Sequence, residues 1–383
     1  MLKKWIFILC IFFVSEIFCR NALCEEDLQL NAKSAVLIDG MNGRVLYGKN
    51  ENERMANAST TKIMTCIVAL ENSSPDDVVE VSDYASSMPD VQLNIRSGEK
   101  YYMKDLLYSL MLESHNDTAV AIAEAVGGSV EGFAAMMNSK AKSIGAFDTN
   151  FVTPNGLDAE GHYTTASDLA KIARYALKNE KFIEVTNTKS YSFSDIDGKR
   201  SFTVNNKDAF LDMMEGAVGV KTGFTGNAGY CFVGAVFRNN RKYISAVLAS
   251  GWPPHKTYKW QDTKKLMQYG IDNFNYQVVY DGREYSSYIS VKKGIKSKCR
   301  IYAEGYENIL VSENDVVDVE YKPDDNITAP VKENDIVGRV IISINGNKYK
   351  EYCLKSSEYI KRKDFAWKFN DIYTRFLLDF LQC

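Results

Sequence analysis

Apolar and polar residues alternate along the first two thirds of the chain with periods that predict both strands and helices. Short apolar runs at residues 35–38 and 44–47 flank a glycine-containing turn, which predicts a β-hairpin. Strand-like segments at residues 229–238 and 243–250, joined by an Asn-Asn pair, predict a second hairpin. Helical spacing predicts helices over residues 61–70, 103–112, 117–126, 130–143, 166–177 and 256–274. This order of elements predicts an α+β domain, with helices packed on a largely antiparallel sheet.

The pattern changes at about residue 276. Short β-rich runs, such as residues 287–291 and 335–344, alternate there with Gly, Asn and Asp, and no long helical pattern interrupts them. We therefore expect a separate small all-β domain over residues 276–364.

The last segment, residues 365–383, has apolar and aromatic residues at helical spacing with charged residues between them. It follows the basic run Lys361-Arg362-Lys363. An amphipathic helix of this kind can lie in a membrane interface, with its aromatic rings at headgroup depth and its cations beside anionic lipid. Packing against its own chain or a partner is the alternative.

The first residues have the layout of a secretory signal peptide. Lys3 and Lys4 precede an apolar run over residues 5–14, and Ala22-Leu23-Cys24 resembles a cleavage site. The run is far shorter than the roughly 20 residues of a membrane-spanning helix. We therefore expect residues 1–24 to be removed, the protein to be exported, and the first folded domain to cover residues 25–275. A lipoprotein anchor at Cys19 or Cys24 is a weaker alternative.

Composition narrows the partners. Hydrophobic residues make up 45% of the chain and charged residues 25%, as in an ordinary globular protein. The formal net charge is −3, and it becomes more negative when the basic leader is removed, which disfavours nucleic acid as a partner. The mature chain keeps an odd, scattered set of cysteines, in which Cys299 with Cys353 is one conceivable bridge. With only three histidines and no HExxH motif, we expect no metal and no cofactor.

Three short motifs that can carry chemistry occur in a fixed order: Ser59-Thr60-Thr61-Lys62, Ser114-His115-Asn116 and Lys221-Thr222-Gly223. Their first residues are 55 positions (114 − 59) and 107 positions (221 − 114) apart. Each motif alone arises often by chance, but together and in this order they are a strong signal.

The first motif can provide an activated nucleophile. Ser59 begins a predicted helix that is apolar on nearly every face, and Lys62 lies one turn further on the same face. A buried lysine whose pKa is lowered can take the serine proton, and Lys221 could be the second cation that lowers it. Free amides at the helix start would favour an oxyanion. A plain helix cap is the alternative for Ser59, and capping is also the alternative for the Ser114 motif.

The third motif can bind an anion. Lys221 beside the Thr222 hydroxyl suits a carboxylate, and Gly223 lets a substrate approach the backbone. The alternative is the end of a surface strand.

These motifs make the chain similar to the low-molecular-mass penicillin-binding proteins of the D-alanyl-D-alanine carboxypeptidase (peptidase S11-like) family. The resemblance also covers the residues that surround the motifs, a mid-chain segment, a proline-containing segment of the β domain and the terminal helix: residues 58–65, 156–158, 161–168, 221–225, 329–332 and 365–383. It implies a penicillin-binding/β-lactamase-like transpeptidase domain followed by the small all-β domain.

The resemblance implies a reaction and a role for each motif residue. The substrate would be a peptidoglycan stem peptide ending in D-Ala-D-Ala, and the same serine would bind β-lactams covalently. The implied roles are Ser59 as nucleophile, Lys62 as general base, Ser114 as proton relay, Asn116 as orienting residue, Lys221, Thr222 and Gly223 as the substrate-binding strand, and the Ser59 and Phe224 amides as the oxyanion hole.

Two residues depart from the family pattern. His115 stands where glycine is common and could narrow the cleft, and a Ser114–His115 pair is a weak alternative for the base. Asn155 stands where some members have histidine, so the residue that activates the deacylating water is open.

Three other functions compete with the carboxypeptidase. Endopeptidase action on cross-links would use the same residues. A class A β-lactamase would need a glutamate base, which residues 150–156 lack. A non-catalytic wall-binding protein is disfavoured because the motifs are intact.

Overall fold

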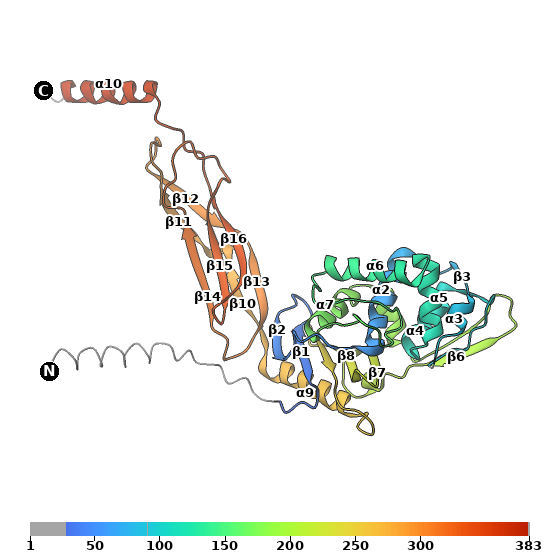
Figure 1. Cartoon of the computed structure of the whole chain (residues 1–383). Helices are drawn as coiled ribbons and strands as arrows, with labels where there is room; N and C mark the ends of the chain where they lie inside the picture. The colour runs from blue at the N-terminus through green and yellow to red at the C-terminus, as the bar shows by residue number, and fades with distance from the viewer. Residues whose placement is uncertain (1–27, 90, 382–383) are drawn as a thin grey trace, which may run out of the picture. The chain divides into compact units, whose positions relative to one another are not determined.

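The computed structural model describes residues 28–89 and 91–381, so the predicted signal peptide lies outside the described residues. The chain divides into two compact units between Asp272 and Asn273. Figure 1 shows a first unit that mixes helices and strands and a second unit built mainly from strands.

A five-stranded sheet with antiparallel pairings lies at the centre of the first unit. Its order is β2 (Val45–Lys49), β1 (Ser34–Asp39), β9 (Arg241–Leu248), β8 (Gly229–Arg238) and β7 (Ala217–Thr225). Both predicted hairpins are confirmed. The second turns at Asn239 and Asn240, whose φ values are +52° and +58°, a backbone shape that asparagine tolerates well. β7 is an edge strand, which leaves one side of its backbone unpaired within this sheet.

Helices cover both faces of this sheet. Side chains alternate along each strand, so each strand contributes apolar residues to both faces. Val36 and Ile38 join the large core that contains α2 and α7, while Leu37 faces the other way, toward Gly270 of α9. The helices of the unit are α2 (Lys62–Asn72), α3 (Asp83–Ser86), α4 (Met103–Leu112), α5 (Asn116–Gly127), α6 (Val130–Ser143), α7 (Ala166–Ala176), α8 (Glu180–Asn187) and α9 (Tyr258–Asn273). The six predicted helices are confirmed to within two residues at each end.

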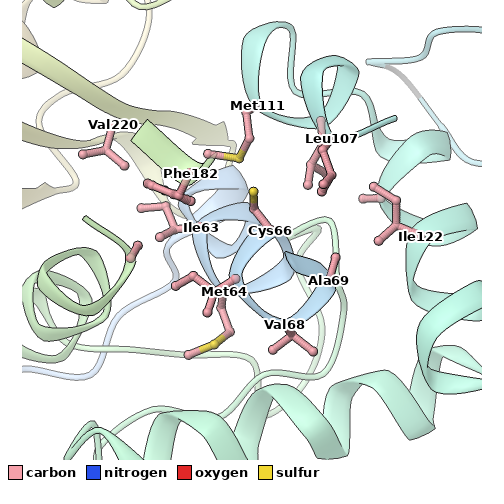
Figure 2. Close-up of a cluster of buried hydrophobic side chains, with 14 of the residues drawn as sticks. Ile63, Met64, Cys66, Val68, Ala69, Leu107, Met111, Ile122, Phe182 and Val220 are labelled. Atoms are coloured by element: carbon pink, nitrogen blue, oxygen red, sulfur yellow. The ribbon is translucent and has the colours of Figure 1, made fainter. Parts of the chain in front are cut away.

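Helix α2 lies at the centre of the core. Figure 2 shows side chains that leave it in different directions, toward α4, α5, α8 and β7. Its residues from Lys62 to Ala69 are all buried. The prediction of a central buried helix is therefore confirmed, and the turn that precedes α2 is held firmly from all sides.

Short elements complete the first unit. They are the 3₁₀ turns η1 (Ala58–Thr61) and η2 (Ala209–Asp212), and the pairs β3 (Val78–Glu80) with β4 (Lys100–Tyr102) and β5 (Ser190–Ser194) with β6 (Ser201–Asn205). η1 precedes α2, and η2 precedes β7.

The second unit contains the expected β domain. One sheet pairs β10 (Asn275–Asp281) with β13 (Tyr306–Val311), and a five-stranded sheet has the order β11 (Ser286–Ser290), β12 (Lys298–Ala303), β16 (Asn347–Ser356), β15 (Ile336–Ile344) and β14 (Val317–Pro323). A short 3₁₀ turn, η3 (Gly282–Glu284), lies between β10 and β11. Cys299 and Cys353 carry free thiols, so the bridge considered from the sequence does not form in this structure.

The chain ends in helix α10 (Phe365–Leu381), which confirms the predicted terminal helix. Its large apolar side chains are exposed, among them Phe365 at 83% and Ile372 at 68%. Within residues 28–89 and 91–381, no single helix is long and apolar enough to cross a membrane, although the bent pair α5 and α6 passes by length and composition alone.

Candidate active site

Ser59 lies in the tight turn η1 directly before the buried helix. The turn begins at Ala58 with φ +47°, and Asn57 braces it by donating from Nδ2 to Thr61 Oγ1 at 2.8 Å. Thr60 Oγ1 donates back to the Asn57 carbonyl at 2.6 Å. Ser59 is half-buried and caps neither η1 nor α2. The capping alternative for Ser59 is therefore wrong, and its hydroxyl is available for another partner.

That partner is Lys62. Its ammonium nitrogen Nζ lies 2.9 Å from Ser59 Oγ, 2.9 Å from Asn116 Oδ1 and 2.6 Å from the carbonyl oxygen of Asn155. The side chain has no exposed surface. Burial first, and then the charge of Lys221, hold the pKa of Lys62 well below its ordinary value. An uncharged amine at hydrogen-bond distance from a serine hydroxyl can accept its proton.

The second motif reaches this cluster through Asn116. Its side chain accepts from Lys62 with Oδ1 and donates with Nδ2 to the Pro89 carbonyl at 3.1 Å. Ser114 lies at the bend before α5 with φ +70°, and its Oγ is buried without a hydrogen-bond partner. An unsatisfied buried hydroxyl is costly and so marks a place where a ligand or a moving proton could be received. In this structure the Ser114 hydroxyl is not bonded to Ser59 or to Lys62.

The loop that faces this motif is held by a buried carboxylate. Asp117 accepts from the backbone amides of Leu93, Asn94 and Ile95 at 2.8 to 3.2 Å. It does not cap α5, whose cap position is His115. Its charge is thus spread over several amides, and the loop that includes the Pro89 carbonyl is anchored beside Asn116.

The third motif lies on the edge strand β7, directly against the nucleophile turn. A Cβ at Gly223 would lie 3.0 Å from the amide nitrogens of both Ser59 and Thr60, so the two backbones touch here. Lys221 is buried and its Nζ donates to the Thr222 carbonyl at 3.2 Å. Burial lowers the pKa of Lys221 to about 7. No hydrogen bond joins Lys221 to the Ser59–Lys62 cluster within the described residues.

Thr222 and Phe224 are more exposed than Lys221 and Gly223 of the same strand. Thr222 is half-buried, and Phe224 is 43% exposed with its ring packed on Tyr230 at a centroid distance of 4.6 Å. The structure thus brings Ser59, Lys62 and Asn116 into one hydrogen-bonded cluster, with Gly223 in contact with its turn. Ser114, Thr222 and Phe224 make no hydrogen bond to that cluster.

Two contributors were missed by the motif argument. The Asn155 carbonyl accepts from Lys62, and the following Gly156 has φ +81° with its Cα packed so closely on the Ala58 carbonyl that no side chain fits. A backbone acceptor leaves no mark in the sequence. The sequence signal for this close approach is the glycine that follows Asn155, because positive φ values favour glycine.

The second missed contributor is His162. Its Nδ1 accepts from the amides of Val152 and Thr153 at 3.1 and 3.3 Å, so Nε2 carries the proton and donates to Thr61 Oγ1 at 2.9 Å. Burial lowers the pKa of His162 to about 4. This neutral imidazole ties the loop that carries Asn155 to the turn that carries Ser59.

His115 points away from the nucleophile. Its Nδ1 lies 2.8 Å from Ser109 Oγ, and its Nε2 lies 3.4 Å from Glu113 Oε2. Burial lowers the pKa of His115, against the pull of Asp117 and Glu113. A Ser114–His115 catalytic pair is therefore wrong in this structure, because the ring is engaged elsewhere. No cluster of His, Cys, Asp or Glu among residues 28–89 and 91–381 could hold a metal ion.

An α+β fold with a Ser-x-x-Lys turn against a Lys-Thr-Gly edge strand defines the penicillin-binding class of serine enzymes. The chain belongs to the D-alanyl-D-alanine carboxypeptidase family, peptidase S11, whose family model matches residues 21–251. Residues 274–362 match the C-terminal domain of penicillin-binding protein 5. The family and fold implied by the sequence resemblance are confirmed.

Individual relatives are similar to most of this chain in sequence or structure. The D-alanyl-D-alanine carboxypeptidase DacF of Bacillus subtilis is 33% identical over 363 residues, which is 91% of this chain and 92% of that protein. Penicillin-binding protein 5 of Haemophilus influenzae superposes with a TM-score of 0.72 at 26% identity, over 87% of this chain and 98% of that one. The carboxypeptidase DacD of Francisella tularensis gives 0.71 at 25% identity, over 87% and 94%.

Proposed function

We propose that this protein is an exported serine carboxypeptidase that removes the terminal D-Ala from peptidoglycan stem pentapeptides through an acyl-enzyme on Ser59. The observation that carries the proposal is the contact of Lys62 Nζ with Ser59 Oγ at 2.9 Å, in which Lys62 is fully buried and Ser59 is half-buried. Burial and the charge of Lys221 favour the free amine that a general base must be, and the hydrogen-bond partners of Lys62 are uncharged.

The first half of the reaction forms the ester. Lys62 takes the proton as Ser59 Oγ attacks the carbonyl carbon of the penultimate D-Ala. The amides of Ser59 and Phe224 stabilise the oxyanion of the tetrahedral intermediate. The C–N bond then breaks, and Ser114 passes a proton to the leaving amine of the terminal D-Ala. The buried, unpartnered Ser114 hydroxyl supports this role, since it is free to rotate toward an incoming group.

The remaining residues hold the substrate. Asn116 orients Lys62 and the substrate amide, while Lys221 and Thr222 bind the terminal carboxylate. Gly223 lets the peptide run along the open edge of β7, because a side chain there would meet the Ser59 turn. Water then hydrolyses the ester. Neither His115 nor His162 is free to activate that water, since both rings are engaged by neighbouring residues.

β-Lactams should acylate the same serine and leave slowly. A fluorescent penicillin incubated with the full chain should label wild-type protein and not Ser59→Ala. A wild-type protein that remains unlabelled would refute the acyl-enzyme mechanism and favour a non-catalytic wall-binding protein. Rapid turnover of the penicillin would instead support a β-lactamase.

Product analysis separates the two peptidase activities. Release of D-Ala from a stem pentapeptide, without cleavage of a cross-linked muropeptide dimer, is the expected result. Faster cleavage of the dimer would make the protein an endopeptidase with the same catalytic residues. Loss of both activities in Lys62→Met, with retained folding, would assign them to one site.

The ends of the chain would place the enzyme outside the cytoplasm. We propose a signal peptide over residues 1–24, a catalytic domain over 25–275, a β domain over 276–364, and an amphipathic membrane-associating helix over 365–383. The exposed aromatic side chains of α10 support the last assignment. Deletion of residues 365–383 should release the protein from the membrane fraction. A truncated protein that still sediments with membranes would show that α10 is not the anchor.

A further inference from the structure

A buried carboxylate outside the three motifs, Asp208, directly precedes a turn that packs against the strand of the proposed carboxylate clamp. Asp208 precedes η2, which packs against β7. Phe210 of this turn contacts Phe232 with ring centroids 5.5 Å apart, and Phe232 lies opposite Thr222 in the sheet. η2 therefore sits beside the Lys-Thr-Gly segment of β7.

One oxygen of Asp208 is unsatisfied. Oδ1 accepts from the Phe210 amide at 3.0 Å, whereas Oδ2 is buried without a hydrogen-bond partner. The side chain of Asp208 is 9% exposed. A buried carboxylate oxygen without a partner is costly unless a nearby positive charge compensates for it.

Lys221 is the clamp cation that acts on this carboxylate. It is 3% exposed, and the acceptor its Nζ contacts is the neutral Thr222 carbonyl. Burial raises the pKa of Asp208 to about 7, while Lys221 and Lys259 act to lower it. Burial lowers the pKa of Lys221, Asp208 acts to raise it, and Lys259 acts in the same direction as burial. The charge of Lys221 also lowers the pKa of Lys62.

We infer that Asp208 is a positioning residue for the carboxylate clamp, which keeps the Lys221 ammonium charged so that it can bind the terminal carboxylate of the substrate at neutral pH. The inference rests on the proposed function. Asp208 does not touch the substrate and forms no direct ion pair with Lys221, so it acts through the field across the gap between η2 and β7.

A pH dependence follows. The pKa values of Asp208 and Lys221 both lie at about 7, and each group acts on the pKa of the other. Without the carboxylate, Lys221 loses its proton at lower pH, because burial and Lys259 then act unopposed. Binding of the substrate carboxylate should consequently fail at a lower pH in an Asp208 variant than in the wild type.

The test compares Asp208→Asn with Asp212→Asn. Asparagine preserves the size of Asp208 and an Oδ1 that can still accept from Phe210. Asp212 is an exposed acid at the other end of the same turn. Each full-length protein is assayed with a peptide ending in D-Ala-D-Ala and with the methyl ester of that peptide.

For Asp208→Asn we expect kcat/KM for the peptide with a free carboxylate to fall about tenfold at slightly alkaline pH, because a shift of one pKa unit changes the charged fraction of Lys221 about tenfold. The fall should come from a higher KM. The alkaline limb should move to lower pH by about one unit. The ester, which lacks the carboxylate, should lose much less. Asp212→Asn should match wild type, and Asp208→Glu should restore part of the loss. Equal losses on both substrates would show a merely structural role and overturn the inference.

An NMR titration gives a readout that needs no turnover. The side-chain Nζ and Cε signals of Lys221, assigned by their loss in Lys221→Gln, should titrate at lower pH in Asp208→Asn than in wild type. An unchanged Lys221 titration would overturn the inference. Failure of wild type to cleave either substrate would instead refute the proposed function, and the titration would still decide the Asp208–Lys221 coupling.

Discussion

Replacement of Gly223 by alanine should slow acylation of Ser59 without unfolding the protein. The added Cβ would lie 3.0 Å from the Ser59 and Thr60 amide nitrogens and 3.1 Å from the Asn57 carbonyl oxygen, whereas ordinary contact begins at 3.4 Å. β7 and the nucleophile turn must therefore separate by about 0.4 Å. A misplacement of about 1 Å at a reacting centre can cost about 100-fold in rate. Scaled to 0.4 Å, the expected loss is about six- to tenfold.

Gly226 provides the matched control. It lies just beyond the end of the same strand, and an added Cβ there would have no heavy atom within 4 Å. The second-order rate of labelling by a fluorescent penicillin is measured for wild type, Gly223→Ala and Gly226→Ala, together with the thermal midpoint of each. Gly226→Ala should label like wild type. If Gly223→Ala labels as fast as Gly226→Ala, the close approach of β7 to the Ser59 turn does not set the reaction geometry.

Three further predictions concern the residues around Ser59. Lys62→Met should slow penicillin labelling by at least about 100-fold, because the general base is lost. Its thermal midpoint should not fall, since an apolar chain replaces a buried amine. A variant that labels as fast as wild type would contradict the assignment of Lys62 as the base. Gly156→Ala should cost far more stability in urea denaturation than Gly161→Ala, because both glycines have positive φ but only the Cβ at 156 would overlap the Ala58 carbonyl; equal costs would mean that φ alone matters. His162 has a pKa of about 4 in the folded protein and about 6.5 in the unfolded chain, so the free energy of unfolding should fall by about 3 kcal/mol as the pH drops from 6.5 to 4. In His162→Gln this part of the pH dependence of the urea midpoint should disappear. If it persists, other groups cause it.

The sequence predicted the helices and strands well and singled out the motif residues, because both leave local patterns. Helices such as α4 and α6 are marked by apolar spacing and by their ends, and Ser59, Lys62 and Lys221 are marked by side-chain type and order. It could not predict the Asn155 carbonyl, since every residue carries one and only the fold places this one beside Lys62. Nor could it predict His162 as a brace, because that role depends on contacts between distant segments.

The proposed mechanism needs opposite charge states at two buried lysines, whose surroundings differ. Lys62 contacts three neutral acceptors, and the acid that acts on it, Asp117, is already engaged by backbone amides. Lys221 has one neutral acceptor, and the acid that raises its pKa, Asp208, has an unsatisfied carboxylate oxygen. Burial lowers the pKa of both lysines, to about 7 at Lys221, where Asp208 opposes the effect. The proposed mechanism uses the free amine at Lys62 as a base and the remaining ammonium at Lys221 to bind an anion. A charge kept on Lys221 by Asp208 would also further disfavour protonation of Lys62.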